Sequence, residues 1–261
     1  RSKHTRGQLG MVVGRCGSDL PPFPTLGVKV SVFHSFIEAC GGRHKLEGLT
    51  TTEVCQRFIK PMTEDSGDAY ADFLLRTAPS GVGTATVFVS HAWGFQFLSI
   101  VDTLVRRFSE TEELLWFDVF SNNQHKALFL PFEWWSSTFQ SAVANIGHTV
   151  LVLAPWEHPV PLTRAWCLWE IFCTVQSETQ LEVVMPEEER LLFQKALLSS
   201  FDTVNKMISN IDVEKSESWI PEDRDKIFAA VRSTVGFNCV NEVVFMQLRE
   251  WLAVSARQQL S

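Results

Sequence analysis

The residues best suited to chemistry lie in one segment, Arg164 to Thr174, which reads RAWCLWEIFCT. Glu170 is its one carboxylate, and Trp166 precedes it by four positions, so on a helix the two side chains share a face. An ionisable group beside large aromatic rings usually has a partner or a task. Glu170 is either structural, paired with Arg164 or Lys126 or capping its own helix, or it is the carboxylate of an active site.

Composition places the chain among ordinary globular proteins and excludes several classes of function. Its 261 residues carry a net charge of -7 and 45% hydrophobic residues. No basic block follows the first fifteen or so residues, which argues against nucleic acid as a partner. Apolar runs such as 149–155 are too short to span a membrane, and no signal-peptide pattern opens the chain. The chain begins at Arg1, so we expect a piece of a longer protein.

Cysteine and histidine usage argues against disulfides and metals. The six cysteines form no CxxC pair and no zinc spacing, which is typical of reduced cysteine in a cytoplasmic protein. The seven histidines include no HxxxH or HExxH pattern, so we expect no metal site. Neither GxGxxG, GxxxxGK[ST] nor GxSxG occurs, which disfavours a dinucleotide fold, a P-loop and a hydrolase elbow.

The pattern along the chain predicts four regions: a tail over 1–28, an N-terminal helical extension over 29–83, an α/β core over 84–186 and a C-terminal helical extension over 187–261, packed on the core. In the core, short apolar runs alternate with amphipathic segments. We expect strands at 85–90, 114–120, 148–154 and 181–185, and helices at 95–108, 132–146 and 164–175. This alternation predicts right-handed βαβ crossovers and a parallel sheet. Further helices are expected at 30–39, 51–59, 68–75, 187–198, 201–211, 222–235 and 239–256.

In an open parallel sheet, ligands bind at the carboxyl ends of the strands. One mouth would then collect an acidic and aromatic set of side chains: Ser90, His91, Trp93, Asp118, Trp156, Trp166 and Glu170. Flat aromatic walls with a few acceptors suit a planar, polyhydroxylated ligand such as a nucleotide. Each residue also has a plainer reading. Ser90 can cap a helix, His91 and Asp118 can serve their own loops, and Trp156 can be packing.

The same segments resemble the Toll/interleukin-1 receptor (TIR) family. The run 86–92, TVFVSHA, is similar to its first strand, 115–119, LWFDV, to its second, and 149–155, TVLVLAP, to its third. The run 166–171, WCLWEI, resembles the WCLxEL helix of plant members and the WxxxE spacing of members that cleave NAD. The resemblance covers about residues 84–186 and implies a flavodoxin-like parallel sheet to which the two helical extensions are added.

The resemblance also implies a site. Glu170 falls at the catalytic position and Trp166 at its aromatic partner. The loop after the first strand, with Ser90, His91 and Trp93, would line the nucleotide site. The loop from Asp118 to Leu130 would serve self-association and substrate access. Four features depart from the family. Ala92-Trp93 replaces its usual arginines, and the 121–131 connection is not its usual acidic, glycine-containing loop. No fifth strand is evident after Glu187, and the helical segments at 29–78 and 187–256 are not part of a minimal TIR domain.

The implied activity is cleavage of the nicotinamide–ribose bond of NAD, as a glycohydrolase or cyclase that is switched on by self-association in signalling or innate immune defence. NAD would be a substrate, and no other cofactor is expected. One carboxylate suffices, because it stabilises an oxocarbenium-like state while nicotinamide leaves as a neutral molecule. Two alternatives remain: a non-catalytic interaction module, which would commonly lack the Glu, and a nucleoside-processing glycosidase or transferase.

Overall fold

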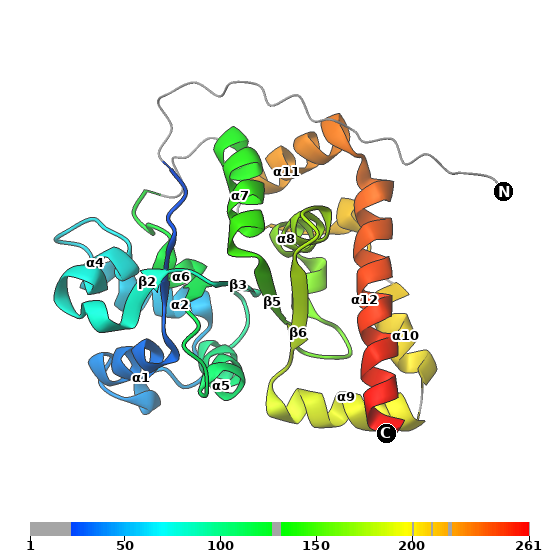
Figure 1. Cartoon of the computed structure of the whole chain (residues 1–261), viewed down its shortest axis with the longest axis horizontal. Helices are drawn as coiled ribbons and strands as arrows, with labels where there is room; N and C mark the ends of the chain where they lie inside the picture. The colour runs from blue at the N-terminus through cyan, green and yellow to red at the C-terminus, as the bar shows by residue number, and fades with distance from the viewer. Residues whose placement is uncertain (1–21, 127–131, 200, 210, 219–220, 261) are drawn as a thin grey trace.

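A computed structural model describes residues 22–126, 132–199, 201–209, 211–218 and 221–260. The chain is an α/β protein with a six-stranded sheet in the order β2-β1-β4-β3-β5-β6, flanked by helices (Figure 1). The four strands of the expected core are β3 (Val87–Ser90), β4 (Leu115–Phe117), β5 (His148–Val152) and β6 (Gln180–Val184).

These four strands are parallel, as the alternating pattern predicted. β3 pairs in parallel with β4 on one side and with β5 on the other, and β5 pairs in parallel with β6. Their order, β4-β3-β5-β6, is compatible with a flavodoxin-like fold. Among the described residues that follow β6, no further strand occurs.

Two features of the sheet differ from the prediction. The second strand ends at Phe117 rather than at 120, because Asp118 opens the short helix α6 (Asp118–Ser121). The Asp118 carboxylate accepts a hydrogen bond from the Val119 N–H at 2.7 Å, and the Asn122 N–H closes the turn onto the Asp118 carbonyl. Such local acceptors favour turns and helix starts over strands.

The second difference is an antiparallel edge. β1 (Leu26–Val28) and β2 (Val82–Thr84) pair antiparallel, and β1 joins β4. A tail over 1–28 was therefore wrong for residues 26–28, while residues 1–21 lie outside the described residues. A Cβ at Gly27 would meet Ala85 and the backbone of Leu114 at 3.0 Å, so the glycine permits this close approach.

Alternation along the strands separates two hydrophobic clusters. Val87, Val89 and Phe117 face one side of the sheet, whereas Phe88 and Trp116 face the other. The first side is covered by α1 (Val30–Ala39), α4 (Tyr70–Thr77), α5 (Phe97–Phe108) and α6. The second is covered by α7 (Phe132–Ile146) and α8 (Ala165–Gln176). Because α5 and α8 lie on opposite faces, the connections that follow β3 and β5 diverge (Figure 1).

The helical segments outside the central strands pack on these two clusters. On the N-terminal side, α2 (Thr51–Val54), a π-helix (Cys55–Ile59) and α3 (Lys60–Met62) form one helical run. On the C-terminal side, the helices are α9 (Glu187–Ser199), α10 (Phe201–Ser209), α11 (Pro221–Thr234) and α12 (Phe237–Leu260). Buried side chains of all four C-terminal helices join the cluster around α8.

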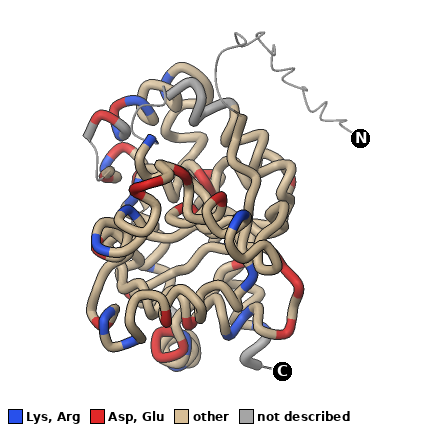
Figure 2. The backbone as a smooth tube through the Cα atoms, turned by 90° about the vertical axis from the view of Figure 1, so that its left-hand side faces the viewer, with Lys and Arg blue, Asp and Glu red and all other residues tan. Residues whose placement is uncertain are grey.

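Charged residues of both signs are distributed over the chain, which has a net charge of -7. In Figure 2, positions of Lys and Arg and positions of Asp and Glu are both spread along the backbone, without one long run of Lys and Arg. Within the described ranges, no helix has the length and apolar character needed to cross a membrane.

Candidate functional site

The candidate site lies where the connections after β3 and β5 diverge. Ser90 is the last residue of β3, and α8, which carries Glu170, follows the adjacent strand β5. In sheets of this kind, the crevice at such a switch point is the usual place for a ligand. Of the residues expected at the mouth, the structure brings Ser90, His91, Trp93, Asp118 and Glu170 together.

Ser90 and Glu170 are in direct contact. The Ser90 hydroxyl donates a hydrogen bond to the Glu170 carboxylate across 80 positions of sequence. Ser90 has the same strand parity as Phe88, so its side chain points to the α8 face of the sheet. Ser90 therefore does not cap the helix that follows it, because α5 begins at Phe97 with Gln96 as its N-cap.

Glu170 has no basic partner in the described part of the chain. Arg164 forms an ion pair with Glu217, at 3.9 Å, rather than with Glu170. Lys126 is exposed, and within the described ranges it forms no ion pair with Glu170. Burial raises the pKa of Glu170 to about 8; the Ser90 hydrogen bond opposes this shift, and the negative charge of Asp118 adds to it. A half-buried carboxyl with this environment is protonated more readily than a surface glutamate and ionises near neutral pH.

Asp118 provides a second carboxyl near that of Glu170. Its carboxylate accepts hydrogen bonds from the Trp93 indole N–H and from the Val119 N–H. Burial raises its pKa to about 7, although both hydrogen bonds oppose the shift. Asp118 thus serves its own turn, as its plainer reading had it, and also contacts the loop after β3. Pairs of carboxyls with perturbed pKa values are enriched at functional sites.

His91 is buried next to the Asp118 carboxyl. Its Nδ1 is 3.8 Å from an Asp118 oxygen, and its ring stacks on Phe117 with centroids 4.7 Å apart. Burial lowers the pKa of His91 to about 3, so the imidazole is neutral. The backbone carbonyl of His91 accepts a hydrogen bond from the Cys167 thiol of α8 at 3.6 Å, which joins the loop to the helix of Glu170.

Sequence reasoning missed the support that α2 gives to this loop. The Thr51 N–H donates to the Phe95 carbonyl, and both the N–H and the hydroxyl of Thr52 donate to the Trp93 carbonyl. Thr50 caps α2 in a capping box with Glu53, and the Thr-x-x-Glu spacing is a signal for such a box. The π-helix follows directly, and π-helical turns are frequent near functional sites.

The two other tryptophans are placed differently. Trp156 is buried against Phe193 of α9, with ring centroids 6.0 Å apart, so it is packing rather than part of the cluster around Glu170. Trp166 is half-buried and contacts Phe139 of α7 at 6.3 Å between centroids. It shares α8 with Glu170, but these contacts direct it to the α7 side.

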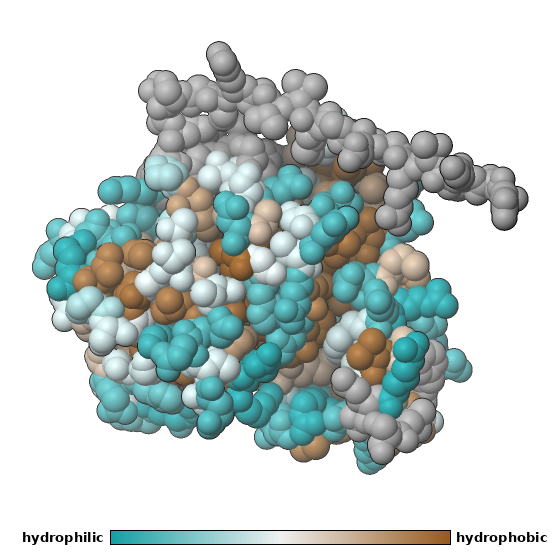
Figure 3. Space-filling model, in the orientation of Figure 1, coloured by the Kyte–Doolittle hydropathy of each residue, from teal (hydrophilic) through white to brown (hydrophobic). Residues whose placement is uncertain are grey.

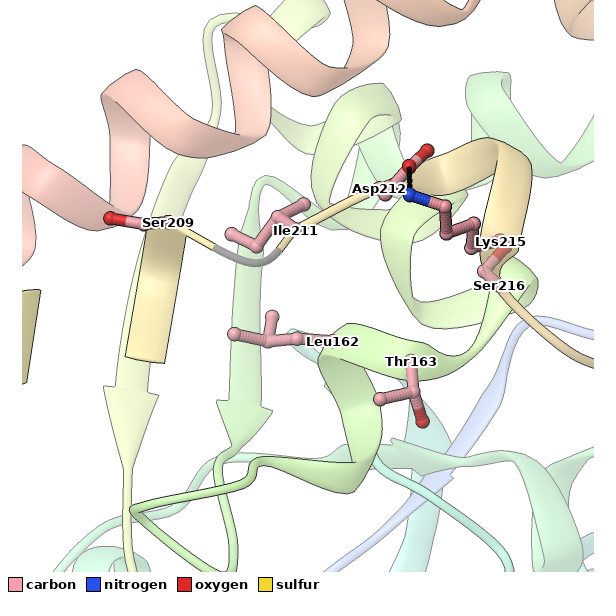
Figure 4. A pocket seen from close by; sticks show the side chains of 7 residues that line it. All are labelled: Leu162, Thr163, Ser209, Ile211, Asp212, Lys215 and Ser216. Carbon is pink, nitrogen blue, oxygen red and sulfur yellow. Dashed lines mark ion pairs between the residues drawn. The ribbon is translucent and has the colours of Figure 1, made fainter. Parts of the chain in front are cut away.

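Two pockets lie away from Glu170. A pocket of about 280 Å³ is lined by residues that flank the start of α8 and the turn after α10: Leu162, Thr163, Ser209, Ile211, Asp212, Lys215 and Ser216 (Figure 4). An ion pair between Asp212 and Lys215, at 2.9 Å, closes part of its rim. A second hollow, of about 570 Å³, lies between Val175 and one side of α12 that includes Met246. Apolar side chains are visible beside α12 in Figure 3.

Comparisons with known protein families, with curated proteins and with solved structures found no match for this chain. Within the described residues, no group of three or more His, Cys, Asp or Glu side chains could hold a metal ion. The chemistry available at this site is therefore that of the Asp118 and Glu170 carboxyls and the groups that contact them.

Proposed function

We propose that the protein cleaves the nicotinamide–ribose bond of NAD, with Glu170 as the catalytic carboxylate. The observation that carries this proposal is the contact between Ser90 and Glu170 at the point where the connections diverge. A carboxyl there, without a Lys or Arg partner among the described residues, suits a cationic substrate better than a structural role. The WxxxE spacing and the parallel order of β3, β4 and β5 support a TIR-like domain of the NAD-cleaving type.

The reaction needs little beyond this carboxylate. As the bond between C1′ of ribose and the ring nitrogen breaks, both electrons go to nitrogen and the pyridinium becomes neutral nicotinamide. The Glu170 carboxylate stabilises the oxocarbenium-like ribose, and a water oxygen then bonds to C1′ and releases a proton. The positive ring of the substrate favours ionised Glu170, so substrate binding lowers the pKa that burial raises.

The remaining cluster would bind and orient the substrate. Ser90 fixes the carboxylate, and Trp93 offers a flat surface next to Asp118. Stacking on an aromatic face suits a positively charged nicotinamide ring. Trp166 stays a predicted part of the site through its place on α8, one helical turn before Glu170.

The test is release of nicotinamide by the purified chain, at high protein concentration, with the E170Q variant beside it. The glutamine side chain keeps an acceptor for Ser90 but cannot stabilise a cation, so we expect a loss on the order of 10²–10³ in rate. E178Q is the matched control, because Glu178 is exposed just after the end of the same helix and is expected to have no effect when substituted. No nicotinamide from the wild-type protein at any concentration would contradict the proposal.

A protein-interaction module is the second candidate. Exposed apolar side chains on α9 and α12 favour it: Leu191, Leu192, Leu198, Met246 and Val254. The two functions are compatible if self-association switches on cleavage. In that case the specific activity rises with protein concentration, and light scattering detects oligomers over the same range.

A further inference from the structure

The imidazole of His91 has a donor and an acceptor that make no hydrogen bond within the described structure. The residue is 5% exposed, and neither ring nitrogen has a hydrogen-bond partner in the described structure. Buried polar side chains are nearly always paired, so each unpaired one needs an explanation. A neutral imidazole offers one donor and one acceptor, and here Nδ1 lies 3.8 Å from the Asp118 carboxylate.

The charge at this end of the site is one-sided. Asp118 and Glu170 are close enough for the charge of Asp118 to disfavour ionisation of Glu170. Within the described chain, neither carboxyl forms an ion pair with Lys or Arg. The imidazole of His91 lies near Asp118 but is neutral, so it supplies no positive charge. A second anionic group placed here would meet like charge in a poorly solvated setting, which is unfavourable.

Asp118 still has room to accept hydrogen bonds. One oxygen accepts from the Val119 N–H and the other from the Trp93 indole, which leaves further lone pairs on both. The indole bond also sets the Trp93 ring beside the carboxylate. A planar ring stacked on Trp93 would lie beside Asp118, the carboxylate that is also 3.8 Å from His91 Nδ1.

We propose that His91 and Asp118 form a subsite for a primary carboxamide, so that the protein discriminates nicotinamide nucleotides from nucleotides of nicotinic acid. This inference rests on the NAD-cleaving function proposed above. The amide NH₂ donates to Asp118, and the imidazole supplies the complementary donor to the amide oxygen. The carboxylate of nicotinic acid has no donor for Asp118 and places a negative charge beside it. It therefore loses the bond to Asp118 and gains a repulsion there, although it can still accept the hydrogen bond from the imidazole.

The experiment compares cleavage of NAD with cleavage of nicotinic acid adenine dinucleotide. For the wild-type protein we expect kcat/KM to favour NAD by on the order of 10-fold or more, as loss of paired buried polar groups implies. In D118N the side-chain amide can donate to the carboxylate of nicotinic acid, so the preference narrows. D102N is the matched control, because Asp102 lies on α5 in an exposed pair with Arg43 and should leave the preference unchanged.

A second variant guards against misfolding of D118N. H91L fills a similar buried volume without polar atoms, and it should raise KM for NAD by on the order of 10-fold with a smaller effect on kcat. Equal cleavage of both dinucleotides by the wild type, or an unchanged preference in D118N and an unchanged KM in H91L, overturns the carboxamide subsite while the NAD-cleaving function stands. Cleavage of neither dinucleotide overturns both.

Discussion

The Ser90 hydroxyl donates a hydrogen bond to the Glu170 carboxylate and so joins the end of β3 to the helix that follows β5. The bond places a titratable group between two neighbouring parallel strands whose connections run to opposite faces. Burial and the nearby Asp118 make its ionised form unfavourable. A half-buried carboxyl whose ionised form is unfavourable is expected to lower the free energy of unfolding, a cost that is common at functional sites.

E170Q tests this disadvantage through the pH dependence of stability. Because the folded-state pKa of Glu170 is raised from 4.5 to about 8, the folded protein holds a proton that the unfolded chain releases. The stability that the folded protein gains by holding this proton is fully present below about pH 4.5 and is lost as pH rises through 8. Relative to wild type, E170Q should gain stability over that window, by on the order of 1 kcal/mol or about 2–4 °C after allowance for screening.

Thermal melts of both proteins at pH 6 and pH 9 measure this difference, and E178Q should follow wild type at both values. A melting temperature of E170Q that falls well below wild type throughout would mean that the carboxylate belongs to a structural ion pair.

S90A tests the hydrogen bond itself. The Ser90 hydroxyl lowers the pKa of Glu170, so its removal raises that pKa further. If ionised Glu170 is required, the rising limb of kcat/KM against pH moves to higher pH, and activity at neutral pH falls. The pH profile of nicotinamide release measures this shift, with S109A on an exposed residue as the control. An unchanged limb with reduced activity at all pH values would leave Ser90 a packing role only.

The sequence was sufficient to predict the parallel strands and the meeting of Ser90 with the α8 helix. The runs in 85–90 and 148–154 are short and apolar, which is how strands buried on both faces read. Their carboxyl ends must share one edge of the sheet, so Ser90 and the first turns of α8 follow. That Ser90 would contact Glu170 directly depends on strand parity and on the rotation of α8, which the pattern does not specify.

Other parts depend on distant contacts and could not be predicted. β1 and β2 have three residues each and contain Gly27 and Gly83, so neither shows the alternation that marks a strand. The attachment of Trp93 to α2 joins residues 41 positions apart. The raised pKa values of Asp118 and Glu170 arise from burial, which only the folded chain defines.

T50A should loosen the loop that carries Trp93. Thr50 caps α2, and α2 holds the Trp93 and Phe95 carbonyls through three hydrogen bonds. Loss of the cap is expected to cost about 1 kcal/mol of stability and to speed amide exchange in α2 and in the 93–97 loop. Hydrogen exchange with mass spectrometry measures this, with T77A, an exposed threonine of α4, as the control. Equal exchange of this loop in both variants would contradict the support that α2 provides.

The last prediction concerns the contact that holds α8 on the sheet. The Thr174 hydroxyl lies 2.9 Å from the Thr149 hydroxyl of β5 and 2.8 Å from the Glu170 carbonyl oxygen, and both threonines are fully buried. T174V leaves the Thr149 hydroxyl buried without this partner, which should cost on the order of 1–3 kcal/mol. T149V should cost less, because Thr174 can still donate to the Glu170 carbonyl.

The double variant T149V/T174V removes both hydroxyls and leaves neither unpaired, so its loss should be smaller than the sum of the two single losses. Urea unfolding of the four proteins gives the coupling energy directly. Strictly additive losses would show that the hydroxyl pair contributes nothing specific. In that case the position of α8 would depend on hydrophobic packing and on the hydrogen bonds of Glu170 and Cys167 to residues 90 and 91.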